Sequence, residues 1–330
     1  MKTSPFAVAL LVLLFLPAPS PGDSKLDQRL KEALAKYPEA DTNNDGVLTL
    51  EEAKAFRQKM RSRNGDARAK VSGEAPQELK PRTEDNPFVR TQGGRCLFLG
   101  HSFFIPVAKT FDELARSGDF PDHHAQFVMS GGGGGAPGRL WQSRKHREAA
   151  TEILQSGAID VLGMTYYDES NCRVEDYRRW IDLAVKHNPE IHIFIGLCWP
   201  DSPESSPNEF DRMLGTATTH VYKTVQTLRE SHPHLSIQFV NYGKVASELK
   251  SNHAAGQVTE VTTLIGKTPD ALFRDQKGHA GPLLLELAAS IWLDQLYEAD
   301  LENVELQRAT SDTTTAIVEK VAEFNERFKQ

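Results

Sequence analysis

Five short apolar runs, separated by amphipathic stretches, are the feature of this sequence that most limits its fold. The runs occupy residues 96–100, 124–129, 159–165, 191–198 and 236–241. Most of their positions are apolar in succession, which is typical of strands that are buried on both faces of a sheet. Strands that alternate with helices indicate right-handed crossovers and a parallel sheet with helices on both sides. Because ligands bind such folds at the carboxyl ends of the strands, functional residues are expected just after each run.

The stretches between and after these runs predict the helical layers. They cover residues 110–118, 138–157, 174–189, 209–231 and 283–297. A last stretch places large apolar residues on one helical face: Ile317, Val321, Phe324 and Phe328. We predict an α/β domain over residues 95–300, followed by a helical extension over residues 301–330 that packs onto it.

The first residues have the organisation of a secretory signal peptide. Lys2 precedes an apolar run over residues 6–16, and Pro17 and small residues follow. The run is shorter than the ~20 residues that a membrane-spanning helix requires. The sequence therefore predicts removal of residues 1–22, export to the periplasm or out of the cell, and no membrane span after cleavage. The exact cleavage site stays open.

Charge and cysteine content exclude two broad classes of protein. The chain has a formal net charge of −7 and no cluster of Lys and Arg, whereas nucleic-acid-binding surfaces need such clusters. Three cysteines, Cys96, Cys172 and Cys198, do not make a disulfide framework. A single pair between Cys172 and Cys198 stays open, and the oligomeric state is not fixed by the sequence.

Residues 41–52, DTNNDGVLTLEE, match the calcium-binding loop of an EF-hand at every defined position. Gly46 falls where that loop turns sharply with positive φ, and helical stretches flank the loop on both sides. Calcium prefers about six to eight oxygen ligands. The expected oxygen donors to Ca²⁺, including the Val47 carbonyl and a water on Thr49, come from Asp41, Asn43, Asp45, Val47, Thr49 and Glu52.

The loop lies in a predicted helix–loop–helix module over residues 25–60. A polar linker with several helix-breaking residues follows over residues 61–94. Because only one such loop is present, we expect weak calcium binding with a structural role rather than signalling. The alternative is an acidic turn that caps the second helix without binding metal.

Three candidate catalytic residues lie next to predicted strands and helices. Ser102 stands two residues after Gly100, at a strand-to-helix turn, where helix N–H groups could stabilise an oxyanion. Asp275 and His279 lie in the segment LFRDQKGHAGP, just before the last apolar helix. Histidine is the usual base for a serine nucleophile, and a carboxylate usually orients it. The alternatives are a helix N-cap at Ser102 and a partnerless histidine at the start of a helix.

A run of five glycines at residues 131–135 follows the second apolar run. Glycine lets the backbone approach a ligand closely and leaves its N–H groups bare, although a flexible loop without a role is the alternative. Together, the serine after the first strand, the glycines after the second and the Asp–His pair near the C-terminus resemble the SGNH (GDSL-like) hydrolases. The resemblance covers about residues 95–297 and is strongest to an exported bacterial branch with a single preceding EF-hand.

This resemblance implies a flavodoxin-like three-layer α/β/α sandwich and a serine esterase. Ser102 would be the nucleophile, His279 the base and Asp275 the residue that orients it. The N–H groups of Ser102 and of Gly134 or Gly135 would form the oxyanion hole. The implied substrate is a small-molecule or glycan ester, with an acyl group on a carbohydrate as the narrower expectation.

Three departures separate this sequence from the family pattern. His101 replaces the usual aspartate before the serine, and the Asp275–His279 spacing is one residue longer than usual. The third strand ends in GMTYYDESNC without the expected asparagine. Tyr167 or Asp168 falls near that place, and Asn171 lies further on. One oxyanion donor is therefore unassigned, which leaves an alternative function: a calcium-binding protein without catalytic activity whose SGNH-like domain binds a glycan or a protein partner.

The remaining candidates have weaker support. Asp122, His123 and His124 are adjacent and could bind a transition metal, but the other histidines have no metal-ligand spacing. Cys198 could act as a nucleophile but has no supporting motif. Four aromatic residues near predicted strand ends could line a substrate cleft or pack in the core: Trp141, Tyr166, Tyr167 and Trp199.

Overall fold

The computed structural model divides the chain into two compact units, Met1–Glu78 and Leu79–Gln330. The structure describes residues 30–31, 34–35, 38–43, 45–49, 52–53, 55–56, 80–83, 88–167, 172–301 and 304–329. The predicted signal peptide, residues 61–79 of the predicted linker and two candidates after the third strand, Asp168 and Asn171, lie outside the described residues. No helix in the described part of the chain is both long and apolar enough to cross a membrane.

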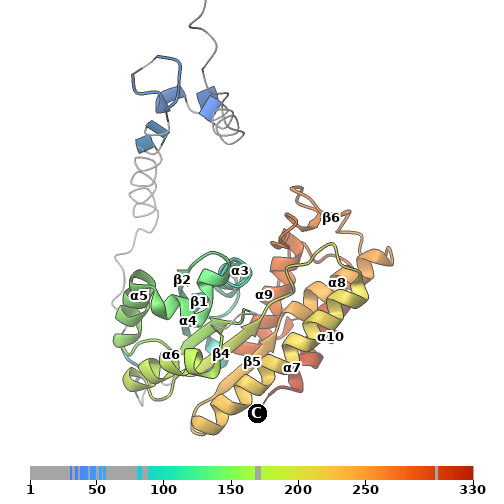
Figure 1. The fold of residues 1–330 in the computed structure, drawn as a ribbon. Helices are drawn as coiled ribbons and strands as arrows, with labels where there is room; N and C mark the ends of the chain where they lie inside the picture. The colour runs from blue at the N-terminus through green and yellow to red at the C-terminus, as the bar shows by residue number, and fades with distance from the viewer. Residues whose placement is uncertain are drawn as a thin grey trace, which may run out of the picture. The chain divides into compact units, whose positions relative to one another are not determined.

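The larger unit is built on a five-stranded sheet in the order β2-β1-β3-β4-β5 (Figure 1). All neighbouring strands run parallel. This strand order is the flavodoxin-like one, so the predicted α/β fold with a parallel sheet is confirmed. The strands are β1 (Arg95–Gly100), β2 (His124–Met129), β3 (Val161–Thr165), β4 (His192–Leu197) and β5 (Ile237–Asn241).

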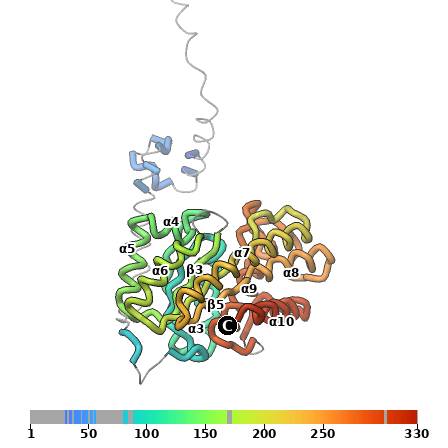
Figure 2. Tube along the Cα trace, turned by 60° about the horizontal axis from the view of Figure 1, so that its bottom comes forward, coloured from blue at the N-terminus to red at the C-terminus, as the bar shows by residue number. Residues whose placement is uncertain are grey.

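Helices cover both faces of this sheet, as the continuous apolar runs require (Figures 1 and 2). One layer holds α3 (Ile105–Ser117), α8 (Gly243–Ala254), α9 (Pro282–Tyr297) and α10 (Asp312–Glu326). The other layer holds α4 (Pro137–Gln142), α5 (Arg144–Gln155), α6 (Val174–His187) and α7 (Pro207–Ser231). The shorter elements are η1 (Pro38–Ala40), η2 (Arg90–Gln92), η3 (Gly132–Gly135), β6 (Thr263–Ile265) and β7 (Ala271–Phe273).

Strand β1 shows why its sequence is apolar at successive positions. Cys96 and Phe98 pack into the layer of α3 and α9, whereas Leu97 and Leu99 pack into the layer of α4 to α7. All four side chains are fully buried. Side chains alternate between the faces of a strand, so a central strand needs an apolar residue at each position when both faces are covered.

Three local features differ from the sequence prediction. The helix expected over residues 138–157 is divided into α4 and α5 at Ser143, whose ψ of 108° is extended rather than helical. Helix α8 and the two-stranded sheet of β6 and β7 were not predicted. Helix α8 has a buried Lys250 and Glu248 among its apolar residues, which obscures the apolar pattern.

Residues 80–83, at the end of the predicted linker, are tied to the amino end of the sheet. Arg82 forms ion pairs with Asp122 (2.8 Å) and Asp160 (3.1 Å), and Arg95 also pairs with Asp160 (2.6 Å). Burial acts to raise the pKa of Asp160, but the hydrogen bonds from Arg95 and Arg82 outweigh it and lower that pKa. The buried carboxylate is therefore ionised and anchors this segment to β1 and β3.

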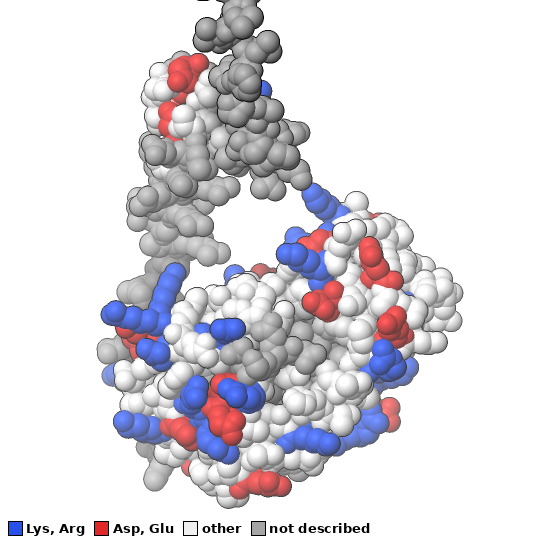
Figure 3. Space-filling view, in the orientation of Figure 1, with Lys and Arg blue, Asp and Glu red and all other residues white. Residues whose placement is uncertain are grey.

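Charges of both signs are mixed over the visible face of the larger unit. Figure 3 shows Lys and Arg side chains next to Asp and Glu rather than in separate fields. Both signs of charge therefore contribute to the electrostatic potential over this face.

Candidate active site

The three candidate catalytic side chains form one chain of hydrogen bonds. The Ser102 Oγ lies 2.9 Å from the His279 Nε2, and the His279 Nδ1 lies 2.8 Å from the Asp275 Oδ2. Ser102 follows β1, whereas the other two residues lie between β7 and α9, about 175 residues further along the chain. The parallel topology brings the carboxyl end of β1 and the start of α9 to the same edge of the sheet.

The turn after β1 places Ser102 in front of α3. The carbonyl of His101 accepts hydrogen bonds from the N–H groups of Phe104 (3.1 Å) and Ile105 (2.9 Å), which closes the turn. Phe104, rather than Ser102, stands at the N-cap position. The alternative reading of Ser102 as an N-cap is therefore wrong, and its hydroxyl contacts the histidine instead.

A tight loop brings Asp275 and His279 together. The Arg274 N–H donates to the His279 carbonyl (2.6 Å), and the Gly278 N–H donates to the Asp275 carbonyl (3.0 Å). Gly278 has φ of +80°, in the left-handed region that favours glycine. The loop thus brings the Asp275 and His279 side chains into contact across three intervening residues.

The carboxylate of Asp275 has the charge that an orienting residue needs. Its slight burial acts to raise the pKa of Asp275, but hydrogen bonds from His279 and the Lys277 N–H lower it overall. The side chains of Asp275 and His279 are 47% and 33% exposed. The group is therefore ionised and reachable from solvent at neutral pH.

Trp199, just after β4, contacts the loop that carries His279. Its indole N–H donates to the Gly278 carbonyl (2.8 Å), one residue before His279. The Trp199 ring stacks on Phe103 (5.5 Å between centroids), and Phe103 meets the imidazole of His279 edge to face (5.2 Å). From the sequence, Trp199 was predicted only to line a cleft or to pack in the core. Its contact with Gly278 joins segments that are distant along the chain, so the sequence did not reveal it.

Of the two candidate oxyanion glycines, Gly135 packs directly on the serine turn. A Cβ at Gly135 would lie 2.6 Å from the Gly100 oxygen and from the His101 Cα. A Cβ at Gly134 would instead meet the Ser130 hydroxyl at 2.8 Å. Glycine at 135 therefore allows the backbone to approach the turn that carries Ser102.

His101 links the serine turn to the end of β3. Its Nδ1 accepts from the Phe103 N–H (3.1 Å), so its proton is on Nε2, which faces the Tyr166 carbonyl (3.1 Å) and the Thr165 hydroxyl (2.9 Å). Burial lowers the pKa of His101 to about 4, so the ring is neutral at neutral pH. The described residues at the end of β3, Thr165 to Tyr167, carry no side-chain amide.

A cavity of about 500 Å³ lies next to the turn that carries Ser102, although Ser102, Asp275 and His279 are not among its lining residues. It is lined by His101 and Phe103, which flank Ser102 in the chain, and by residues at the ends of β3 and β4 and along α7. Tyr166, Tyr167 and Trp199 line it, whereas Trp141 packs against Trp180 in the core. Cys198 also lines the cavity, but burial raises the pKa of its thiol to about 12, which does not suit a thiolate nucleophile.

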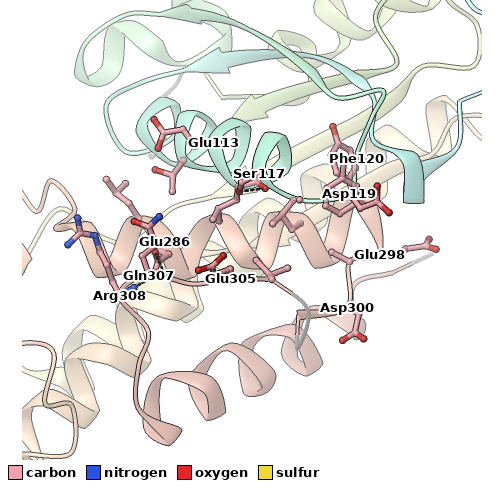
Figure 4. A pocket seen from close by; sticks show the side chains of 18 of the residues that line it. Glu113, Ser117, Asp119, Phe120, Glu286, Glu298, Asp300, Glu305, Gln307 and Arg308 are labelled. Carbon is pink, nitrogen blue, oxygen red and sulfur yellow. Dashed lines mark hydrogen bonds between the residues drawn. The ribbon is translucent and has the colours of Figure 1, made fainter.

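A larger cavity of about 740 Å³ lies elsewhere, between α3, α9 and residues 299–308 (Figure 4). None of Ser102, Asp275 and His279 lines it. Several acidic residues line it, and the Glu286 carboxylate accepts hydrogen bonds from the N–H groups of Gln307 (2.9 Å) and Arg308 (2.8 Å). That carboxylate thus holds the segment that follows α9.

The candidate calcium loop lies in the smaller unit. The Gly46 N–H donates to the Asp41 Oδ2 (2.9 Å), with φ of +80° at Gly46, and the Asp41 Oδ1 is buried without a hydrogen-bond partner. The Glu52 carboxylate accepts from the hydroxyls of Thr49 (2.7 Å) and Thr42 (2.9 Å). Hydrogen bonds from Thr49, followed by those from Thr42, lower the pKa of Glu52 to about 2.

The other metal candidates have different partners. Asp122 pairs with Arg82, and His123 contacts Asp112 and Tyr297. Within the described ranges, the described part of the calcium loop included, no three His, Cys, Asp or Glu side chains converge as a metal site. Cys96, Cys172 and Cys198 form no disulfide with one another.

No family model matches this chain, and no curated protein matches it. Among solved structures, it is similar to the periplasmic domain of a lipopolysaccharide acetyltransferase from Salmonella ser. Paratyphi A. The identity is 10% and the TM-score 0.34, over 52% of this chain and 76% of that domain. A likeness at this level carries no inference about activity.

Proposed function

We propose that the larger unit is a serine hydrolase that cleaves esters and acts outside the cytoplasm, as the predicted signal peptide implies. The supporting observation is the continuous chain of hydrogen bonds from the Ser102 Oγ through His279 to Asp275. These three residues lie at the carboxyl edge of the parallel sheet, and folds of this kind bind their ligands at that edge. The two side chains of the Asp–His pair are also open to solvent.

In this proposal, the Ser102 Oγ attacks the ester carbonyl while the His279 Nε2 accepts its proton. The alcohol then leaves with that proton, and an acyl-serine forms. Water gives a proton to His279, attacks the acyl group and releases the acid, after which Ser102 regains its proton. Asp275 orients the imidazole, and the N–H groups of Ser102 and Gly135 face the developing oxyanion.

Hydrolysis of p-nitrophenyl acetate by the mature chain and its Ser102→Ala variant tests this proposal. We expect turnover by the natural chain and a fall of roughly 10⁴-fold or more in the variant, because the nucleophile is lost. Equal rates for two folded proteins would contradict it. The carbohydrate O-acyl substrate rests on the family resemblance alone and would be examined with acetylated glycans.

One observation favours a second candidate function, the binding of a glycan or protein partner without catalysis. The described residues that end β3 supply no amide as an oxyanion donor, and loss of one donor costs about 10²–10³ in kcat. Binding of acetylated glycans by the Ser102→Ala variant, combined with an inactive natural chain, would support this alternative.

We also propose that residues 41–52 bind Ca²⁺. The positive φ of Gly46, the buried unpartnered Asp41 oxygen and the ionised Glu52 support this proposal. Side-chain oxygens of Asp41, Asn43, Asp45 and Glu52, the Val47 carbonyl and a water on Thr49 would hold the ion, with a structural role. Calorimetric titration should give one site with Kd of about 10⁻⁴–10⁻³ M that Glu52→Gln abolishes. Unchanged binding in that variant would refute this assignment.

A further inference from the structure

The cavity of about 500 Å³ beside Ser102 has an apolar interior. Leu197 and Leu214, both nearly fully buried, form part of its wall. Met213 and Ala217 contribute from one side of α7. These side chains offer contact to an apolar group and few hydrogen bonds to a polar one.

Two of the aromatic rings that line this cavity, those of Trp199 and Tyr166, are too buried to form an open platform for a sugar. Trp199 is 2% exposed, its ring is stacked on Phe103, and its N–H is used by the Gly278 carbonyl. Tyr166 is 5% exposed. Sugar binding needs an accessible ring face with hydrogen-bonding groups around it, and these two side chains expose very little surface.

Three polar residues of α7 that line the cavity are exposed, whereas His101, which also lines it, is buried. Arg212, Thr216 and His220 recur at every fourth position of α7, and all three are exposed. An ester with one apolar end would therefore place that end inside and keep its polar part near these side chains. The volume falls within the range of roughly 300–1,000 Å³ in which pockets bury large ligand groups, and it exceeds what an acetyl group needs.

We propose that this cavity receives a bulky apolar or aromatic group of the ester substrate, and that Met213 and Ala217 set its size limit. This inference rests on the proposed ester hydrolysis. The apolar group belongs either to the acyl side or to the alcohol side of the ester, and two substrate series distinguish them. In either case acetate esters of small alcohols are poor substrates.

The test uses the full chain, with p-nitrophenyl acetate, butyrate and octanoate as the acyl series and methyl and 2-phenylethyl acetate as the alcohol series. The variant Ala217→Phe fills the cavity. The control Thr219→Phe adds the same ring to an exposed position of the same helix, outside this cavity. Circular dichroism and thermal melting show whether both variants are folded.

In at least one series, the natural chain should favour the bulky member by about tenfold or more in kcat/KM. Ala217→Phe should remove that preference, while Thr219→Phe should retain it. A natural preference for the small member in both series, or an unchanged preference in folded Ala217→Phe, would overturn the inference.

A second readout separates this inference from the proposed function. If the natural chain hydrolyses no ester, binding of sodium octanoate and 3-phenylpropionate is measured by calorimetry with the natural chain and both variants. Binding that Ala217→Phe abolishes and Thr219→Phe retains would support the cavity assignment although the esterase proposal fails. Absence of binding, or equal binding by all three, would overturn it.

Discussion

The two edges of the sheet carry the same chemical groups in the same order. At the carboxyl edge, Asp275, His279 and Ser102 are linked by bonds of 2.8 and 2.9 Å. At the amino edge, Asp112, His123 and Tyr297 are linked by contacts of 3.0 and 2.6 Å. Each histidine thus lies between a carboxylate and a hydroxyl.

The two groups differ in what else contacts the hydroxyl. The Tyr297 hydroxyl also contacts the N–H (3.0 Å) and carbonyl (3.1 Å) of Gly94 and the Cys96 Sγ (3.3 Å). Burial raises the pKa of Tyr297 well above its usual value and the pKa of Cys96 to about 12. The His123 side chain is 1% exposed, against 33% for His279. An Asp–His–hydroxyl series is therefore a candidate site only where the hydroxyl remains accessible.

The largest expected effect is the difference between substituting His279, which should reduce activity, and substituting His123, which should reduce stability. His279→Ala should lower ester hydrolysis by about 10⁴-fold, because the base is lost, and change the free energy of unfolding by less than about 0.5 kcal/mol. His123→Ala should destabilise the chain by about 3 kcal/mol, because it leaves buried polar groups without partners, yet keep most of the activity.

Urea unfolding and p-nitrophenyl acetate hydrolysis measure both quantities on both variants. The comparison between the edges would fail if His123→Ala, while folded, lost as much activity as His279→Ala. It would also fail if the two variants were equally destabilised.

A second prediction concerns how stability depends on pH through two buried histidines, His101 at the carboxyl edge of the sheet and His192 at the amino edge. Burial lowers the pKa of His101 and of His192 from 6.5 to about 4, assisted at His192 by Arg90. As the pH falls, the unfolded chain binds these protons first, so stability is complete above pH 6.5 and is lost between pH 6.5 and about 4. Each histidine should therefore lower the free energy of unfolding by about 2 kcal/mol at pH 5 relative to pH 7.

Urea unfolding at pH 7 and pH 5 tests this dependence. Between pH 7 and pH 5, the His192→Asn variant should lose about 2 kcal/mol less unfolding free energy than the natural chain. This difference does not depend on how the substitution changes stability at pH 7. A loss that is the same with and without His192 would show that this side chain is not held neutral by burial.

The smallest expected effect concerns the support of His279 by Trp199. Trp199→Phe keeps an aromatic ring but removes the hydrogen bond to the Gly278 carbonyl. Since such a hydrogen bond contributes about 1 kcal/mol net, its loss predicts a fall of about fivefold in kcat. Asn188→Ala removes a comparable bond at the amino edge, to the Ile159 carbonyl (2.8 Å), and should leave kcat unchanged. Equal kcat values for the two variants would show that Trp199 has a structural role only.

The sequence predicted the strands well because their apolar runs are continuous and local. It also grouped Ser102, Asp275 and His279 before the structure placed them within hydrogen-bonding distance, although their catalytic role stays a prediction. It could not predict the bond from Trp199 to the Gly278 carbonyl or the cavity wall along α7, since both depend on how distant segments pack. The series of Asp112, His123 and Tyr297 was missed for the same reason, because its members come from three separate segments.

Covalent labelling of Ser102 is the most direct test of the central claim. The full chain would be treated with a fluorophosphonate, in which a nucleophilic serine oxygen displaces fluoride, and the labelled peptide would be identified by mass spectrometry. The account predicts one adduct, on Ser102, whose formation is abolished by His279→Ala and retained in His123→Ala. No adduct on Ser102 in the folded natural chain, or labelling of Ser102 at an equal rate in both variants, would contradict it.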